Sequence, residues 1–267
     1  MSQHGTTAFR HRMLDELTIG DEPSFRHVGV YADLKEVLRR AQYPFRVLPK
    51  SAAGRADRAL LLNLTFWGAD AGGDVLTDDY IEADVVAHAA WHHLAARAMA
   101  GAAGAKPSVE ALFLGEAVAS AFDVYLVGRL LGHAPHSTFL ETQVPAMAEA
   151  AYAAGLGEDE FEHLLQGIAA DADGAFTDLR ELLFDATVAL FACRGPEEAY
   201  AALAAFDTHR FASLLHRYEL SNWVLYARAH GDDGVDAARA RAVDHALREE
   251  KVALDWLAAK WIAPALG

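Results

Sequence analysis

Two histidines and one glutamate near the middle of the chain have the types and spacing that suit a metal ion. His88 and His92 lie in the segment VVAHAAWHHLAARAM, and Glu116 follows in LFLGEAVASAFD. An α-helix turns by about 100° per residue, so side chains four residues apart lie about 40° apart and about 6 Å along the axis. Their rings can therefore converge on one ion. Two imidazoles and one carboxylate leave coordination positions open, and both Zn and Fe(II) accept such a set.

The position of Glu116 strengthens this interpretation. It interrupts an otherwise apolar helical segment, where an unpaired carboxylate carries a large desolvation cost. A histidine pair on the preceding helix offers the partner that it needs, so we expect one divalent metal ion, Zn or Fe(II). The alternative is that both histidines are ordinary polar residues of an Ala-rich helix and that Glu116 pairs elsewhere.

Three further residues are candidates for a supporting role around the ligands. A metal-bound histidine usually donates its second N–H to a carboxylate or carbonyl. Asp84, one turn before His88, and Asp123 could accept such a bond. His93 is rotated by about 100° from His92 on a helix, which favours packing or an outer position over binding the same ion.

The order HAAWH and then GEAVAS resembles the gluzincin metallopeptidases, whose pattern is His-Glu-x-x-His with a downstream Glu often followed by Ala. The resemblance covers about residues 59–131. It implies a zincin-like fold with a β-sheet edge before the first site helix. It also implies that His88, His92 and Glu116 are the three metal ligands.

The chain departs from the gluzincin pattern at Ala89, which stands where the family has its general base. Loss of a positioned base commonly costs a factor of about 10² to 10⁴ in rate. We therefore expect a metal-dependent hydrolytic or Fe-dependent redox enzyme rather than a standard peptidase, acting on a small-molecule or peptide substrate. A non-catalytic pseudo-peptidase that binds a peptide or a partner is the first alternative. In the gluzincins a later Tyr or His stabilises the oxyanion. The segment HRYELSNWVLYARAH offers four such residues, and their spacing singles out none of them, so no catalytic residue can be named: His216, Tyr218, Tyr226 and His230.

A second alternative is a helical di-iron oxidoreductase. Glu160 and His163 have the Glu-x-x-His spacing of di-iron helix bundles. Such sites use the motif on two helices, and the chain has no convincing second copy. An exposed acidic helix face also explains this pattern.

Composition limits the classes of partner and the location. The formal net charge of −15 argues against binding along a nucleic-acid backbone, where Lys and Arg must neutralise phosphates. The single cysteine, Cys193, excludes an intramolecular disulfide and fits a reducing compartment. The N-terminus lacks the apolar core of a signal peptide, and charged residues interrupt the longest apolar stretch. We expect a cytoplasmic protein that binds neither nucleic acid nor membrane.

The pattern of apolar residues predicts an α+β fold that is predominantly α-helical. Residues 1–24 are polar and are expected to form an N-terminal arm, residues 25–131 a zincin-like metal-binding region with a small α/β part, and residues 132–267 a helical C-terminal region. HVGVY and PFRVLP are β-prone runs on either side of a helix-like segment. Helices are expected at about 79–100, 108–131, 138–154, 158–170, 176–192, 196–205, 208–228 and 235–262, with Asp78 or Asp79 and Ser108 as N-caps.

Overall fold

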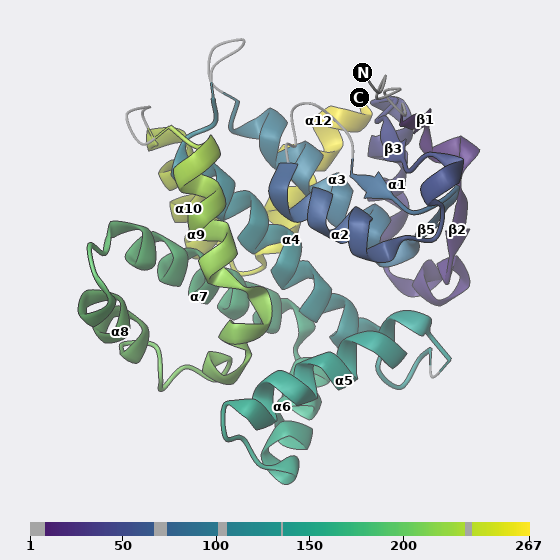
Figure 1. The fold of residues 1–267 in the computed structure, drawn as a ribbon. Coiled ribbons are helices and arrows are strands. Elements are labelled where there is room, and N and C mark those ends of the chain that lie inside the picture. Colours follow the sequence, from purple (N-terminus) through teal and green to yellow (C-terminus); the bar gives the residue numbers. More distant parts are fainter. Residues whose placement is uncertain (1–8, 67–73, 101–105, 135, 233–236) are drawn as a thin grey trace.

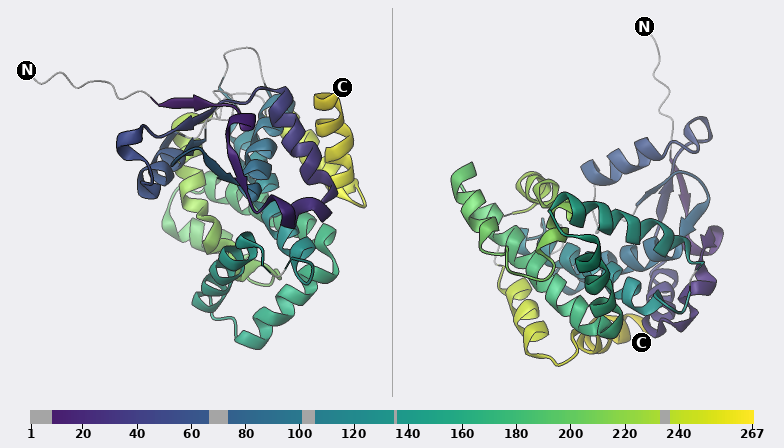
Figure 2. Two further views of the ribbon diagram at one scale, coloured as in Figure 1. Left: turned by 90° about the vertical axis from the view of Figure 1, so that its right-hand side faces the viewer. Right: turned by 90° about the horizontal axis from the view of Figure 1, so that it is seen from below.

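The computed structural model describes residues 9–66, 74–100, 106–134, 136–232 and 237–267. Helices dominate, and two small sheets lie at one side of them (Figure 1). Both views of Figure 2 show the strands gathered in the N-terminal part of the chain. The predicted α+β, predominantly helical fold is confirmed.

The two sheets join segments that are far apart in sequence. In the first sheet, β1 (Arg10–Arg12) is antiparallel to β3 (Phe45–Val47), which is parallel to β4 (Val75–Leu76). In the second, β2 (Thr18–Gly20) is parallel to β5 (Tyr80–Glu82). Residues 10–20 thus provide two strands where the sequence predicted a polar arm. Strands of three residues are too short to show an alternating pattern, so only their distant partners reveal them.

The β-prone run HVGVY does not form a strand, and this expectation was wrong. The 3-10 helix η2 (Glu22–His27) leads directly into α1 (Gly29–Arg40). Tyr31, Leu34 and Leu38 form a buried stripe with helical spacing, and burial of that stripe outweighs the β propensity of the valines. The run PFRVLP does contain the strand β3. The rest of this part comprises η1 (Leu14–Glu16), η3 (Lys50–Ala52) and the helix α2 (Ala56–Phe66).

The two helices predicted to carry the metal site are present as α3 (Ala83–Ala98) and α4 (Val109–Leu130). Ser108 caps α4 as predicted, since its Oγ accepts from the Ala111 N–H at 3.2 Å. The predicted cap of α3 was wrong, because residues 80–82 form β5 and Glu82 occupies the N-cap position. Asp79 instead binds two arginines of β1, at 2.6 Å from Arg10 and 2.9 Å from Arg12.

Helix α4 is the centre of the fold. It packs against α3 on one side and α7 (Ala172–Ala192) on another, and α3 in turn packs against α1. A helix that is apolar all round must be buried on all sides. By length and composition α4 could span a membrane, yet 83% of its most apolar stretch is buried inside the protein. Such burial is typical of a core helix.

The C-terminal half is helical, as predicted, with two corrections. The segment 208–228 contains the 3-10 helix η4 (Ala212–Tyr218) and then α9 (Leu220–His230), separated by Glu219 at φ +47°. A left-handed residue cannot continue a helix. The segment 235–262 divides into α10 (Ala238–Glu249), α11 (Ala253–Leu257) and the π-turn η5 (Ala258–Ile262). The other helices are α5 (Thr138–Ala153), α6 (Glu158–Ala170), α8 (Pro196–Ala204) and α12 (Ala263–Leu266).

Candidate metal centre

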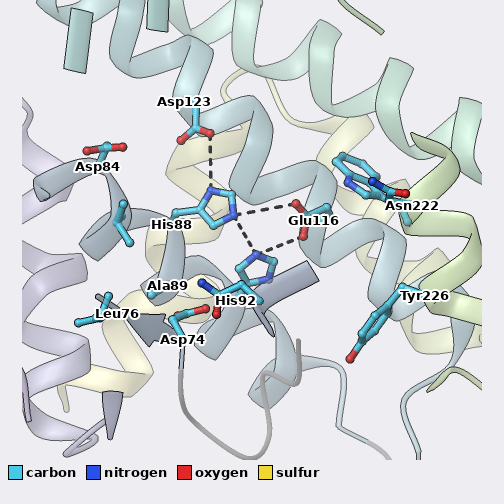
Figure 3. Close-up of a pocket in the computed structure, with 13 residues that line it drawn as sticks. Asp74, Leu76, Asp84, His88, Ala89, His92, Glu116, Asp123, Asn222 and Tyr226 are labelled. Atoms are coloured by element: carbon cyan, nitrogen blue, oxygen red, sulfur yellow. Dashed lines mark hydrogen bonds and ion pairs between the residues drawn. The ribbon is translucent and has the colours of Figure 1, made fainter. Parts of the chain in front are cut away.

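His88 and His92 lie one turn apart on α3 and face the same point (Figure 3). Their Nε2 atoms are 3.0 Å apart, and their ring centroids are 4.8 Å apart. Two lone pairs at this distance repel each other, so a shared proton or a cation must lie between them. His92 is 5% exposed, whereas the His88 side chain is 31% exposed. The pair therefore forms the inner wall of a site that opens past His88.

Glu116 of α4 completes the group. Its Oε2 lies 3.2 Å from His92 Nε2, and its Oε1 lies 3.9 Å from His88 Nε2. Atoms that bind one ion at about 2.0 to 2.2 Å are about 2.8 to 3.6 Å apart in octahedral or tetrahedral geometry. The distances of 3.0 Å and 3.2 Å fall in this range, whereas the 3.9 Å contact involves the other carboxylate oxygen. With one ligand atom taken from each residue, the three atoms lie within 4.8 Å of one another. The three predicted ligands thus form a group that could hold a metal ion.

A glycine allows α4 to lie this close to α3. A Cβ at Gly115 would approach the Cβ of Ala95 on α3 to 3.3 Å, which is tighter than ordinary contact. A side chain here would require α3 and α4 to shift by a few tenths of an ångström. The glycine next to Glu116 therefore favours close packing of the helices that carry the carboxylate and the two imidazoles.

Asp123, one of the three residues predicted to support the ligands, lies beside His88. Its Oδ2 lies 3.6 Å from His88 Nδ1, on the far side of the ring from Glu116 (Figure 3). A carboxylate here favours a proton on Nδ1 and leaves the Nε2 lone pair free for an ion. Ser120 donates a hydrogen bond to Glu116 Oε1 at 3.4 Å. Both partners orient the ligands.

The charges of the site act on one another. Burial lowers the pKa of His88, but the contact with Asp123 and the charges of Asp123 and Glu116 raise it, with a net value of about 9. Burial raises the pKa of Glu116, while the charge and hydrogen bond of His92 lower it below its ordinary value. Glu116 is therefore ionised at neutral pH, as a metal ligand must be.

Asp84 lines the same pocket, but it forms no ion pair with any residue that the structure describes. Burial, followed by the charge of Asp123, raises its pKa to about 7. Figure 3 places it beyond His88, on the side away from Glu116. It is thus a wall residue close to Asp123 rather than the acceptor of a His88 proton.

His93, the third supporting candidate, lies outside the site. Its ring packs edge-on against Tyr43 with centroids 5.6 Å apart, and burial followed by the charge of Arg97 lowers its pKa. His93 is absent from the described lining of the pocket. A packing role, which the helical rotation favoured, accounts for these contacts.

The ligand group lies in a cavity of ≈ 290 Å³. Ala89, 1% exposed, forms part of its wall at the position where gluzincins have a base. Residues from three other segments complete the lining: Asn63 of α2, Asp74 and Leu76 at β4, and Asn222, Trp223 and Tyr226 of α9. Except for Tyr226, sequence reasoning missed these residues. Sequence spacing did not distinguish Tyr226 from His216, Tyr218 and His230. The packing of α9 against α4 does, because it places Tyr226 in the lining of the cavity.

Glu160 and His163, the residues of the di-iron alternative, are exposed on α6. Glu160 accepts a hydrogen bond from the Gly157 N–H at 2.8 Å and so caps its own helix. Within the described residues, the group of His88, His92 and Glu116 is the one with the spacing of a metal site.

The overall pattern is a His-His-Glu group on two packed helices that could hold a metal ion, open to a cavity walled by a third helix. Comparisons with known protein families, with curated proteins and with solved structures give no match to this chain. The function therefore has to be argued from the site itself.

Proposed function

We propose that this protein binds one divalent metal ion, Zn or Fe(II), through His88, His92 and Glu116. The observation that carries the proposal is the convergence of two imidazole nitrogens, 3.0 Å apart, with a carboxylate whose oxygens lie 3.2 Å and 3.9 Å from them, at the wall of a cavity. A structural metal site has a closed shell of protein ligands, whereas three ligands beside a cavity are typical of sites where substrate reaches the ion.

A bound ion would supply Lewis-acid chemistry, or one-electron chemistry if it is iron. The protein's own part is to fix the ligands. Asp123 holds the proton of His88 at Nδ1, and Ser120 holds one carboxylate oxygen of Glu116. Ala89 itself offers no proton acceptor at the position where gluzincins have their base, although Asp74 and Asp84 line the same cavity. The absence of a base at this position favours metal-dependent chemistry other than standard peptide hydrolysis. The proposed protein is zincin-like and cytoplasmic.

Metal content tests the proposal. Purified protein is expected to retain about one zinc or iron per chain after dialysis, measured by inductively coupled plasma mass spectrometry. His88→Ala and Glu116→Ala are expected to lose the ion and any metal-dependent activity, while His163→Ala, an exposed histidine on α6, keeps both. Circular dichroism confirms folding of each variant. Folded wild-type protein that takes up no ion from added Zn²⁺ or Fe²⁺ would refute the proposal.

Two other functions give different results in the same measurement. A pseudo-peptidase that uses the cavity to bind a peptide or partner predicts metal-free protein whose binding survives His88→Ala. A di-iron oxidoreductase predicts two ions per chain and loss of iron in His163→Ala. The exposure of Glu160 and His163 and the helix-capping bond of Glu160 favour the single-metal proposal.

A further inference from the structure

The cavity beside the triad is strongly acidic. Four carboxylates are among its described lining residues: Asp74, Asp84, Glu116 and Asp123. No Lys or Arg is among them. A divalent ion on the triad would offset about two of these charges, so the remaining wall still carries negative charge. An anionic substrate would be repelled from such a cavity, and a cationic one attracted.

Within the described structure, two of the four carboxylates contact the histidines within 4 Å and two do not. Glu116 and Asp123 lie beside His92 and His88. Among the described contacts, the Asp74 carboxylate accepts a single long hydrogen bond, from the Tyr43 hydroxyl at 3.4 Å. Neither Asp74 nor Asp84 forms an ion pair with a described residue.

The chain offers these two carboxylates no Lys or Arg as a counter-ion, and His88, when its ring is protonated, is the cation whose charge acts on both. All Lys and Arg residues of the chain belong to the described residues, because residues 1–8, 67–73, 101–105, 135 and 233–236 contain none. Asp74 and Asp84 are both partly buried. A partly buried carboxylate without a cation is destabilising unless a ligand provides one. The raised pKa of Asp84 reflects this cost.

The wall formed by α9 adds aromatic surface to the acidic lining. In Figure 3, Asn222 and Tyr226 of α9 lie on one side of the triad, whereas Asp84 of α3 lies beyond His88 and Asp74 lies beside Ala89 and His92. Trp223 and Tyr226 both line the cavity. Aromatic faces attract ammonium and guanidinium groups and also pack against the alkyl chain that carries them.

From this arrangement we infer that the cavity takes a substrate with a primary ammonium or guanidinium group, which binds against Asp74 and Asp84 while another part of the molecule reaches the metal. This inference rests on the proposed function, because the metal triad anchors the reacting part. Asp74 and Asp84 are specificity-determining residues in this account and are not ligands of the ion.

Three hydroxamates of similar length test the inference, because a hydroxamate binds a divalent ion and the other end of each probe can be varied. They are 6-aminohexanohydroxamate, the neutral heptanohydroxamate and the monohydroxamate of adipic acid. Titration calorimetry with zinc-loaded protein is expected to give 6-aminohexanohydroxamate at least a tenfold lower Kd than the neutral probe. This difference corresponds to the gain from about one hydrogen bond to a charged group. The adipic acid probe, which carries a carboxylate, is expected to bind most weakly.

Asp74→Asn and Asp84→Asn are expected to reduce the preference for the amine while leaving the neutral probe unchanged. Asp159→Asn, an exposed aspartate of α6, is the matched control and keeps the preference. Equal metal-dependent affinity for all three probes would overturn the inference and leave the metal site standing. Absence of metal-dependent binding of any probe would instead overturn the proposed function. The wild-type series decides the question even if a variant fails to fold.

Discussion

Replacement of Asp123 by alanine is expected to weaken metal binding without removing a ligand. In the wild-type protein its carboxylate lies 3.6 Å from His88 Nδ1 and favours the tautomer whose Nε2 faces the ion. Loss of such a partner typically lowers metal affinity by about 10- to 100-fold, or about 1.4 to 2.7 kcal/mol. Asp123→Asn is expected to lose less, because its amide oxygen still accepts the proton of Nδ1.

Competition with a chromophoric zinc chelator measures this change, with the exposed Asp159→Ala as control. The same variant has a second readout that needs no metal. The pKa of Asp84, about 7 in the wild-type protein, is expected to fall, since the charge of Asp123 is its second cause after burial. Carboxyl-detected NMR follows that titration. Unchanged zinc affinity in Asp123→Ala would refute the assignment of Asp123 as the partner that orients His88.

Three further predictions concern pH, the wall of the cavity and the core. In metal-free protein, the free energy of unfolding should fall as pH rises from 6.5 to about 9. The reason is that His88, whose pKa is raised in the folded state, stabilises the fold only while its ring is protonated. Denaturant titrations at several pH values should show a weaker pH dependence for His88→Gln than for the wild-type protein. Ala89→Glu should raise metal-dependent hydrolysis of an activated ester by about 10²-fold or more, and an unchanged rate would exclude a zincin-like geometry. Arg180→Ala should cost about 3 to 5 kcal/mol in urea unfolding, because Arg180 is fully buried and its Nη1 lies 2.5 Å from Asp244 Oδ1. A loss below about 1 kcal/mol would contradict this.

The ligand group could be predicted from the sequence because it depends on local geometry. The spacing of His88 and His92 determines their common direction on any helix, and the apolar surroundings of Glu116 require a nearby partner. Asp123 was a candidate for the same reason. Asp84 and His93 show the limit of this reasoning, since helical spacing fixes a direction but not which neighbouring element a side chain meets.

The rest of the cavity could not be predicted, because it depends on contacts between distant segments. Asp74 precedes a two-residue strand, and Asn222 lies on a helix more than a hundred residues after the ligands. Strands β1 and β2 were missed because their composition does not mark them as strands. They are strands because they form hydrogen bonds with β3 and β5, which are distant in the sequence. The break at Glu219 was missed because a left-handed glutamate has no clear signature in sequence.

Anomalous diffraction from crystals grown with Zn²⁺ tests the central claim most directly. The account predicts one strong peak per chain, about 2.0 to 2.2 Å from the Nε2 atoms of His88 and His92 and from a carboxylate oxygen of Glu116. A zinc peak elsewhere, or no peak while the three side chains keep their positions, would contradict it.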